Sequence, residues 1–193
     1  MGKIEMMAES EVITHADLDK KFLRAIRQKA GADFSRCFQC KTCSAGCPFS
    51  EIMDPFPNVV MRFVQLGLMK EALECSTIWI CVSCNTCSIQ CPQAIDIPGV
   101  MDALRQMAIS KKAHIAEPDI VHFHNEVLHS IKKYGRTHKL EIMMKYKLKR
   151  DWFGDLDVGL KMLAKRKLDL TPSKIKKAGV MKKLFKKYKL KQI

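Results

Sequence analysis

Apolar residues recur at helical spacing along most of the chain, and the alternation typical of β-strands is nearly absent. The first helical pattern begins near Asp17, with Asp17 or Thr14 as a suitable cap, and ends at Gly31. Its apolar positions are Leu18, Phe22, Ala25 and Ile26. We therefore expect a mostly α-helical protein.

Two more helices are predicted between residues 48 and 80. A break at residues 54–57, which contains two prolines, precedes them. The first of these helices ends at Gly67, and the second runs from Leu68 to Cys75. The apolar positions of the first are Val59, Val60, Phe63, Val64 and Leu66.

The second half of the chain continues the helical periodicity. A helix is predicted from Asp96 to about residue 111, another from Glu117 to Gly135, and a last one after Thr171. Their apolar positions are, in turn, Val100, Met101, Leu104, Met107 and Ala108; Ile120, Phe123, Val127, Leu128 and Ile131; and Ile175, Ala178, Val180, Met181, Leu184, Phe185 and Tyr188.

Eight of the nine cysteines fall in two runs with the same spacing, CxxCxxCxxxCP, at residues 37–48 and 81–92. This is the spacing of bacterial ferredoxins that hold two [4Fe–4S] clusters. One tight loop with cysteines at i, i+3 and i+6 can bind three iron atoms of a cubane cluster, so the fourth ligand comes from elsewhere. The neighbouring residues that also recur are Thr42 and Thr86, Ser44 and Ser88, and Pro48 and Pro92.

In two-cluster ferredoxins the cysteine before the proline binds the other cluster, which predicts the two ligand sets. The ligands of cluster 1 are Cys37, Cys40, Cys43 and Cys91. The ligands of cluster 2 are Cys81, Cys84, Cys87 and Cys47.

Three other interpretations of these cysteines fit the pattern less well. Structural zinc usually takes two CxxC pairs, or CxxC with two histidines, separated by a longer arm. A disulfide framework needs an oxidising compartment, and nothing in the sequence suggests export. Buried apolar cysteines would not repeat at this spacing.

The composition bounds the remaining possibilities. A hydrophobic content of 47% supports a real core, and no run of 18 apolar residues predicts a membrane-spanning helix. The N-terminus lacks the charged and apolar regions of a signal peptide. From the cysteine usage we expect a cytoplasmic, reducing and anaerobic setting. No glycine-rich dinucleotide loop and no nucleophile with a nearby base is recognisable, so the sequence predicts no active site.

The excess of positive over negative charge is confined to the last third of the chain. Residues 1–130 contain 13 Lys and Arg against 15 Asp and Glu, whereas residues 131–193 contain 21 against 5. Apolar residues punctuate the basic region, among them Trp152, Phe153, Leu156, Val158, Leu160, Met162 and Leu163. This favours a basic docking arm, and a solvated tail is the alternative.

Three further features carry weaker signals. Cys75 is interpreted as a buried free thiol. Trp79, two residues before Cys81, is either an apolar shield over a cluster or an ordinary core residue. The histidines at residues 114–138 are interpreted as surface or packing residues.

A minimal ferredoxin connects its motifs with compact strands and turns, whereas this chain has a helical spacer. We therefore expect an α-helical ferredoxin-type domain with two [4Fe–4S] clusters at residues 31–112. An N-terminal extension with a helix, residues 1–30, precedes it, and a helical, basic docking region, residues 113–193, follows it.

The combination resembles the iron–sulfur C subunit of the CoB–CoM heterodisulfide reductase of methanogenic archaea. The resemblance rests on both cysteine motifs, the helical spacer that ends in residues 77–80, and Ile95, Asp96 and Ile97 before a helix. Residues 155–157 and 161–163 of the Lys-rich tail complete it. All eight ligand positions of the family are present.

The resemblance implies electron transfer inside a soluble complex. In this family the A subunit holds flavin and splits electron pairs, and the B subunit reduces the heterodisulfide. The C subunit relays electrons from A to B through two cubanes. A hydrogenase or formate dehydrogenase module feeds the assembly.

Two other functional classes stay open at this point. One is the iron–sulfur subunit of another oxidoreductase, which oxidises glycerol 3-phosphate, lactate or succinate, or belongs to a sulfur-oxidising heterodisulfide-reductase-like system. The other is a nucleic-acid-binding protein with structural clusters, suggested by a pI of about 9.4.

Overall fold

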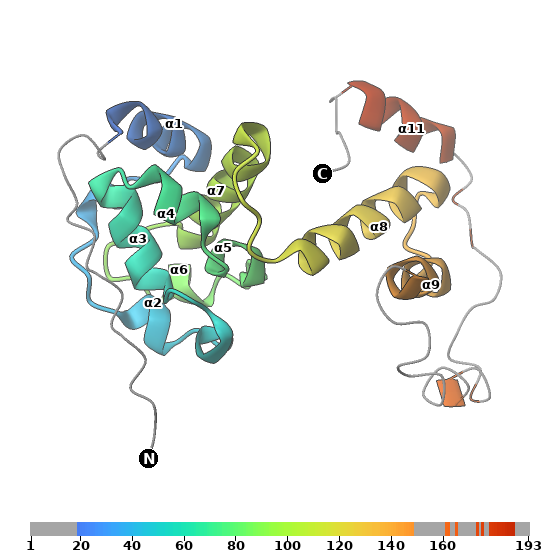
Figure 1. Ribbon diagram of the computed structural model, residues 1–193, viewed down its shortest axis with the longest axis horizontal. Helices are drawn as coiled ribbons and strands as arrows, with labels where there is room; N and C mark the ends of the chain where they lie inside the picture. The colour runs from blue at the N-terminus through green and yellow to red at the C-terminus, as the bar shows by residue number, and fades with distance from the viewer. Residues whose placement is uncertain are drawn as a thin grey trace, which may run out of the picture. The chain divides into compact units, whose positions relative to one another are not determined.

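The computed structural model describes residues 19–148, 161–162, 165, 173, 175 and 178–187. It divides the chain into two compact units, Met1–Ala116 and Glu117–Ile193 (Figure 1). The described residues form α-helices and short 3₁₀ turns and contain no β-strand. This confirms the predicted mostly α-helical fold.

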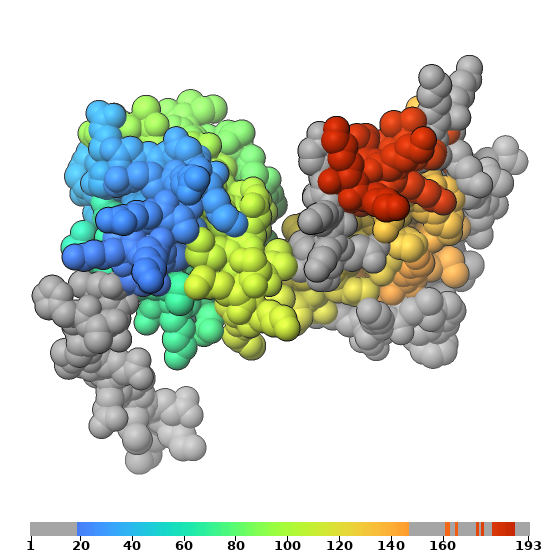
Figure 2. Space-filling model, turned by 90° about the horizontal axis from the view of Figure 1, so that it is seen from above, coloured from blue at the N-terminus to red at the C-terminus, as the bar shows by residue number. Residues whose placement is uncertain are grey.

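Helix α1, Lys20–Ala30, lies in the first unit and packs against α7, Ile97–Lys111. Figure 2 shows α1 (blue) beside the end of α7 (yellow-green) on the surface of this unit. The side chain of Asp19 caps α1 by accepting hydrogen bonds from the N–H groups of Lys21 and Phe22, at 2.8 and 3.0 Å. The cap is thus Asp19, whereas Asp17 and Thr14, which the sequence suggested, lie outside the described residues.

Glycine is needed at the end of the first spacer helix, α3, which spans Pro57–Leu66. Gly67 has a φ of +73°, and a Cβ at this position would lie 3.0 Å from the backbone nitrogen of Asp19. That nitrogen donates to the Gly67 carbonyl at 3.1 Å. The close approach of the two backbones joins the start of α1 to the end of α3.

The spacer contains three helices, one more than predicted. Helix α4 spans Met69–Glu74, and a single turn, α5, spans Thr77–Ile80 directly before Cys81. Ser76 Oγ donates to the Asp54 carbonyl at 2.8 Å, and Thr77 Oγ1 donates to the carbonyl of Pro55. These bonds tie α5 to the proline-rich break, a long-range connection that helical periodicity does not report.

Helix α7 forms the centre of the first unit. Asp96 caps it by accepting a hydrogen bond from the Gly99 N–H at 3.0 Å, as the Asp96–Ile97–Pro98 start predicted. It contacts α1, α4, α5 and α6 (Thr86–Ile89). Its predicted apolar face is buried: Val100, Met101, Leu104, Met107 and Ala108 are each at most 5% exposed. This helix therefore forms the support on which the second cysteine loop rests.

The second unit is built on α8, Pro118–Tyr134, which packs against α9, Lys139–Leu148, and α11, Ala178–Lys187. Ser130 connects α8 to α9, because its Oγ accepts from the His138 N–H at 2.7 Å. In α11 the predicted apolar residue Phe185 is buried, whereas Val180 and Leu184 are exposed. Most of the predicted docking arm, including Trp152 to Leu160, lies outside the described residues.

The predicted apolar face of α8 is not its most buried face. Val121, Ser130 and Tyr134 are buried, whereas Phe123 is 41% exposed. Phe123 instead makes an edge-to-face contact with Tyr146 of α9, at 5.9 Å between ring centroids. Because α8 contacts two helices, its buried residues do not follow a single stripe.

Candidate iron–sulfur cluster sites

The two cysteine motifs adopt the same backbone conformation. Each contains a single helical turn, α2 at Thr42–Ala45 and α6 at Thr86–Ile89, and the two turns contact each other. Before each turn, two residues have positive φ, at positions that match across the 44-residue offset. They are Gln39 (61°) and Lys41 (65°), and Ser83 (55°) and Asn85 (63°). The repeat in sequence is therefore also a repeat in local structure.

The first cavity lies against the first motif. Its lining includes three cysteines of that motif and the last cysteine of the other, namely Cys37, Cys40, Cys43 and Cys91. Met61, Ile95 and Ile97 add apolar surface to its walls. The cysteine before Pro92 therefore faces the first cavity although it belongs to the second motif.

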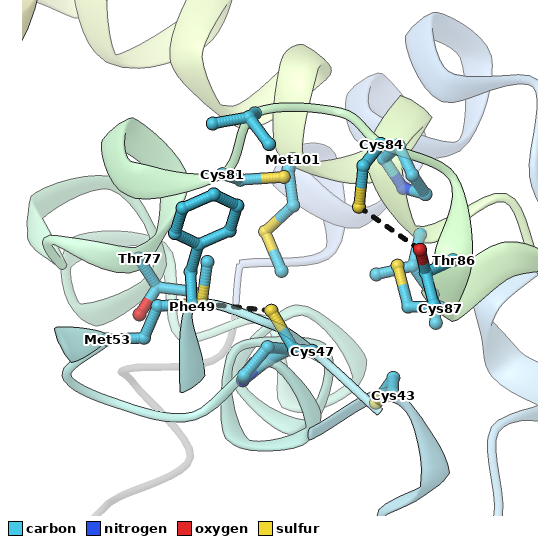
Figure 3. A pocket seen from close by; sticks show the side chains of 14 residues that line it. Cys43, Cys47, Phe49, Met53, Thr77, Cys81, Cys84, Thr86, Cys87 and Met101 are labelled. Carbon is cyan, nitrogen blue, oxygen red and sulfur yellow. Dashed lines mark hydrogen bonds between the residues drawn. The ribbon is translucent and has the colours of Figure 1, made fainter. Parts of the chain in front are cut away.

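The second cavity has the reciprocal arrangement (Figure 3). Its lining includes three cysteines of the second motif and the last cysteine of the first, namely Cys81, Cys84, Cys87 and Cys47. Cys43 also touches this cavity, so it lies between the two sites. Phe49, Met53 and Met101 supply much of the apolar wall of this cavity.

Burial gives the cysteines different acidities. Burial raises the pKa of the Cys43 thiol, and burial followed by the neighbouring cysteines raises the pKa of Cys87 to about 12. Such thiols become thiolates when bound metal compensates the negative charge. The donor set therefore fits cationic iron in both cavities.

The pKa of the exposed cysteine of each motif, Cys40 or Cys84, is shifted in the opposite direction. Cys40 lies 3.3 Å from Thr42 Oγ1, and Cys84 lies 3.4 Å from Thr86 Oγ1. These hydrogen bonds from the threonine hydroxyls lower the pKa of Cys40 and of Cys84. The recurring threonines thus stabilise the thiolate at the same position of each loop.

Polar side chains of α3 support the first loop. Gln65 Nε2 donates to the carbonyls of Cys37 and Phe34, at 2.7 and 3.2 Å. The buried Asn58 accepts from Ser44 Oγ at 2.7 Å and donates through Nδ2 to Gln39 Oε1 at 3.3 Å. Helix α3 therefore holds the loop by neutral amide groups.

A cation of α7 supports the second loop. Arg105 donates through Nη2 to the Cys81 carbonyl at 2.6 Å and through Nε to the carbonyl of Ile78. Within the loop, Ser88 Oγ donates to the Ile95 carbonyl at 3.1 Å.

Asn58, Gln65 and Arg105 were not identified as site residues from the sequence. Asn58 and Arg105 are polar positions beside the apolar stripes of their helices, which is the only sequence signal for them.

Other candidate residues lie apart from the cavities. Trp79 is 2% exposed and does not line either cavity, which favours the core interpretation. Cys75 is a buried free thiol, as predicted, and burial raises its pKa. In the described part of the chain, no group of three or more Cys, His, Asp or Glu side chains is placed so that it could hold a single metal ion.

Exposed apolar residues flank both loops. Phe38 and Val82, at matching positions one residue after the first cysteine of each motif, are 59% and 58% exposed. Ile89, near the end of the second loop, is 83% exposed. Each loop thus presents an apolar surface next to an exposed cysteine, Cys40 or Cys84.

Residues 33–95 match the 4Fe-4S dicluster domain family. This segment contains both cysteine motifs and the helical spacer between them. The iron–sulfur C subunit of the CoB–CoM heterodisulfide reductase from Methanopyrus kandleri is 31% identical over 114 residues, which is 55% of this chain and 59% of that protein. Over these residues the chain is similar to this iron–sulfur protein.

Two further relatives carry related names. The C subunit of the H₂:CoB–CoM heterodisulfide, ferredoxin reductase of Methanothermobacter marburgensis is 29% identical over 53% of this chain and 56% of its own length. The C subunit of the ferredoxin:CoB–CoM heterodisulfide reductase of Methanosarcina acetivorans is 34% identical over 52% of this chain and 39% of its own. The matches span between about two fifths and three fifths of the relatives' length. Among the described helices, none has both the length and the apolar composition needed to cross a membrane.

Proposed function

We propose that the chain is the electron-transfer subunit of a CoB–CoM heterodisulfide reductase and binds two [4Fe–4S] clusters. The observation that carries this proposal is the reciprocal placement of the last cysteines. Cys91 lines the cavity of the first motif, and Cys47 lines the cavity of the second. Each cavity is lined by at least four cysteines, and a cubane requires four ligands.

Cluster 1 is assigned to Cys37, Cys40, Cys43 and Cys91, and cluster 2 to Cys81, Cys84, Cys87 and Cys47. When bound, each cluster supplies a one-electron redox centre. The protein's own contribution is to hold both centres in one compact unit, with α2 and α6 in contact between them. Phe49, Met53 and Met101 limit the access of water to cluster 2.

The proposed route of electrons follows what the resemblance of the sequence implies, together with the exposed edges of the loops. Electrons pass from the flavin-containing A subunit of heterodisulfide reductase to its heterodisulfide-reducing B subunit, and a hydrogenase or formate dehydrogenase module supplies them in the cytoplasm. The exposed residues Phe38 and Val82 provide apolar surface for a neighbour at either loop. On this proposal the substrate site belongs to a partner, and this chain carries none.

An iron–sulfur subunit of a related anaerobic oxidoreductase is the second candidate. One observation favours keeping it: a relative from Archaeoglobus profundus, 28% identical over 57% of this chain, is named as a protein that is only like the C subunit of heterodisulfide reductase. Purification of the native complex separates the candidates. Copurification with the A and B subunits, and CoM–S–S–CoB reduction by the complex, supports the first, whereas different flavin or substrate partners support the second.

The cofactor content is tested on the purified chain. We expect anaerobically prepared protein to contain about eight iron and eight sulfide per chain, the stoichiometry of two cubanes. The Cys75→Ser variant is the matched control, because Cys75 lies outside both cavities and should leave the iron content unchanged. Protein that contains zinc in place of iron, or only four iron atoms, contradicts the proposal.

A further inference from the structure

The two loops are held at equivalent backbone atoms by different side chains. Gln65 donates to the carbonyls of Phe34 and Cys37, and Arg105 donates to the carbonyls of Ile78 and Cys81. Each acceptor pair lies at the same place relative to its motif, because the pairs are 44 residues apart. The amide of Gln65 therefore has the same role at the first loop as the guanidinium of Arg105 has at the second.

The charge of Arg105 is held close to the second loop. Its side chain is half-buried, and two of its N–H groups donate to the backbone that leads into and forms the Cys81 position. In the described part of the chain, no carboxylate forms a salt bridge with Arg105. Asp102, one turn earlier on α7, accepts from Gln106 at 2.7 Å instead.

The first loop has cations nearby, but they are exposed. Arg36 and Lys41 belong to the segment around the first motif, and Arg62 reaches Gln65 Oε1 at 3.5 Å. Water and salt screen exposed charges much more strongly than partly buried ones. The side chains of α3 that hydrogen-bond to the loop, Asn58 and Gln65, are neutral.

We propose that Arg105 is a positioning residue that raises the reduction potential of cluster 2 relative to cluster 1. This inference rests on the proposed function, because it requires both clusters. Reduction adds negative charge, so a cation close to the loop stabilises the reduced state. With an amide on one side and a guanidinium on the other, the electron resides preferentially on cluster 2. The difference in potential gives electron transfer between the two sites a preferred direction, which the shared cysteine spacing alone does not provide.

The experiment is a potentiometric titration of the anaerobically prepared full chain, followed by EPR. In Arg105→Gln the second loop receives the same amide that supports the first. We expect the potential of cluster 2 to fall and that of cluster 1 to stay unchanged. The one-electron equilibrium constant between the clusters should fall about tenfold, which corresponds to about 59 mV. The Cys84→Ser variant identifies the signal of cluster 2, because serine replaces one of its proposed ligands.

Two further variants separate the effect of a cation near a loop from the effect of the hydrogen bonds that support the loop. Arg105→Lys keeps the cation but lacks the planar fork, so it should keep the potential of cluster 2 near the wild-type value even where iron is released faster. Lys41→Asn gives the first loop the residue found at the matching position, Asn85, and should leave the potential of cluster 1 nearly unchanged.

Three results would overturn the inference. They are an unchanged cluster 2 potential in Arg105→Gln, equal shifts of both clusters in that variant, and an Arg105→Lys shift as large as that of Arg105→Gln. A protein that holds eight iron atoms but gives one of these results refutes the role of Arg105 and leaves the proposed function standing. A wild-type protein without two clusters refutes the proposed function itself.

Discussion

The two cysteine loops share a sequence pattern and a backbone conformation, yet each has a different environment. Both contain two residues with positive φ before a single helical turn, and both have a threonine beside the second cysteine sulfur. The first loop is supported by the amides of Asn58 and Gln65 on α3, the second by Arg105 on α7. The spacing of cysteines therefore specifies the loop, whereas the helix packed against it specifies its electrostatics.

The largest effects are expected from substitution of Cys47 and Cys91, the cysteines that line the cavity of the other motif. Cys47→Ala should abolish cluster 2 and largely spare cluster 1, because Cys47 lines the second cavity. Iron should fall from about eight to about four atoms per chain, measured by metal analysis and EPR. Cys91→Ala should have the mirror-image effect on cluster 1. Loss confined to the first cluster in Cys47→Ala would show that the ligands do not cross.

A smaller effect is expected where only the support of the first loop is removed. Asn58→Ala deletes the acceptor of Ser44 Oγ and leaves that buried contact unmade. The free energy of unfolding should fall by about 1–3 kcal/mol, measured by anaerobic denaturant titration. Cluster 1 should also release iron to a chelator faster than in the wild type.

Ser88→Ala is the matched control in the second loop. It removes one hydrogen bond, from Ser88 Oγ to the Ile95 carbonyl, and should cost about 0.5–1.5 kcal/mol. Its iron release should be faster only at cluster 2. Equal release from both clusters in either variant would mean that the two loops are not supported separately.

The smallest expected effect is a change in reduction potential that should be the same at both clusters. Thr42→Val and Thr86→Val remove the hydroxyl groups that lie 3.3 and 3.4 Å from the sulfurs of Cys40 and Cys84. Hydrogen bonds to cluster sulfur raise the reduction potential, so each variant should lower the potential of its own cluster. The two shifts should be similar to each other and smaller than that of Arg105→Gln. Clearly unequal shifts, measured by the same EPR titration, would show that the loops differ locally as well as in their supports.

Much of the fold was predictable because helix ends are encoded locally. Gly31, Gly67 and Gly135 each end a helix with positive φ, and Asp96 begins α7, all as the sequence indicated. The predictions differed from the structure where packing decides. The short helix α5 depends on bonds to residues 54 and 55, and the buried face of α8 depends on two neighbouring helices. Neither set of contacts produces a periodic pattern of apolar residues in the sequence.

The same division applies to the site. All eight cysteines were predicted as ligands from spacing. In the structure four of them line the first cavity and five line the second, because Cys43 lines both. Asn58, Gln65 and Arg105 were not identified, because they lie on helices outside the motifs. Their partners are 14, 28 and 24 positions away in the chain. The spacing of residues within a motif or a helix carries no information about partners this far away in the chain.

The sequence by itself determined the kind of cofactor and the shape of the loops that would hold it. Three cysteines within seven residues constrain a loop through local bonds alone, and the repeat shows that this happens twice. Only the tertiary structure decided what surrounds each loop. The packing of α3 and α7 brings a neutral amide to one pair of carbonyls and a cation to the other, and Coulomb interactions depend on those distances in space.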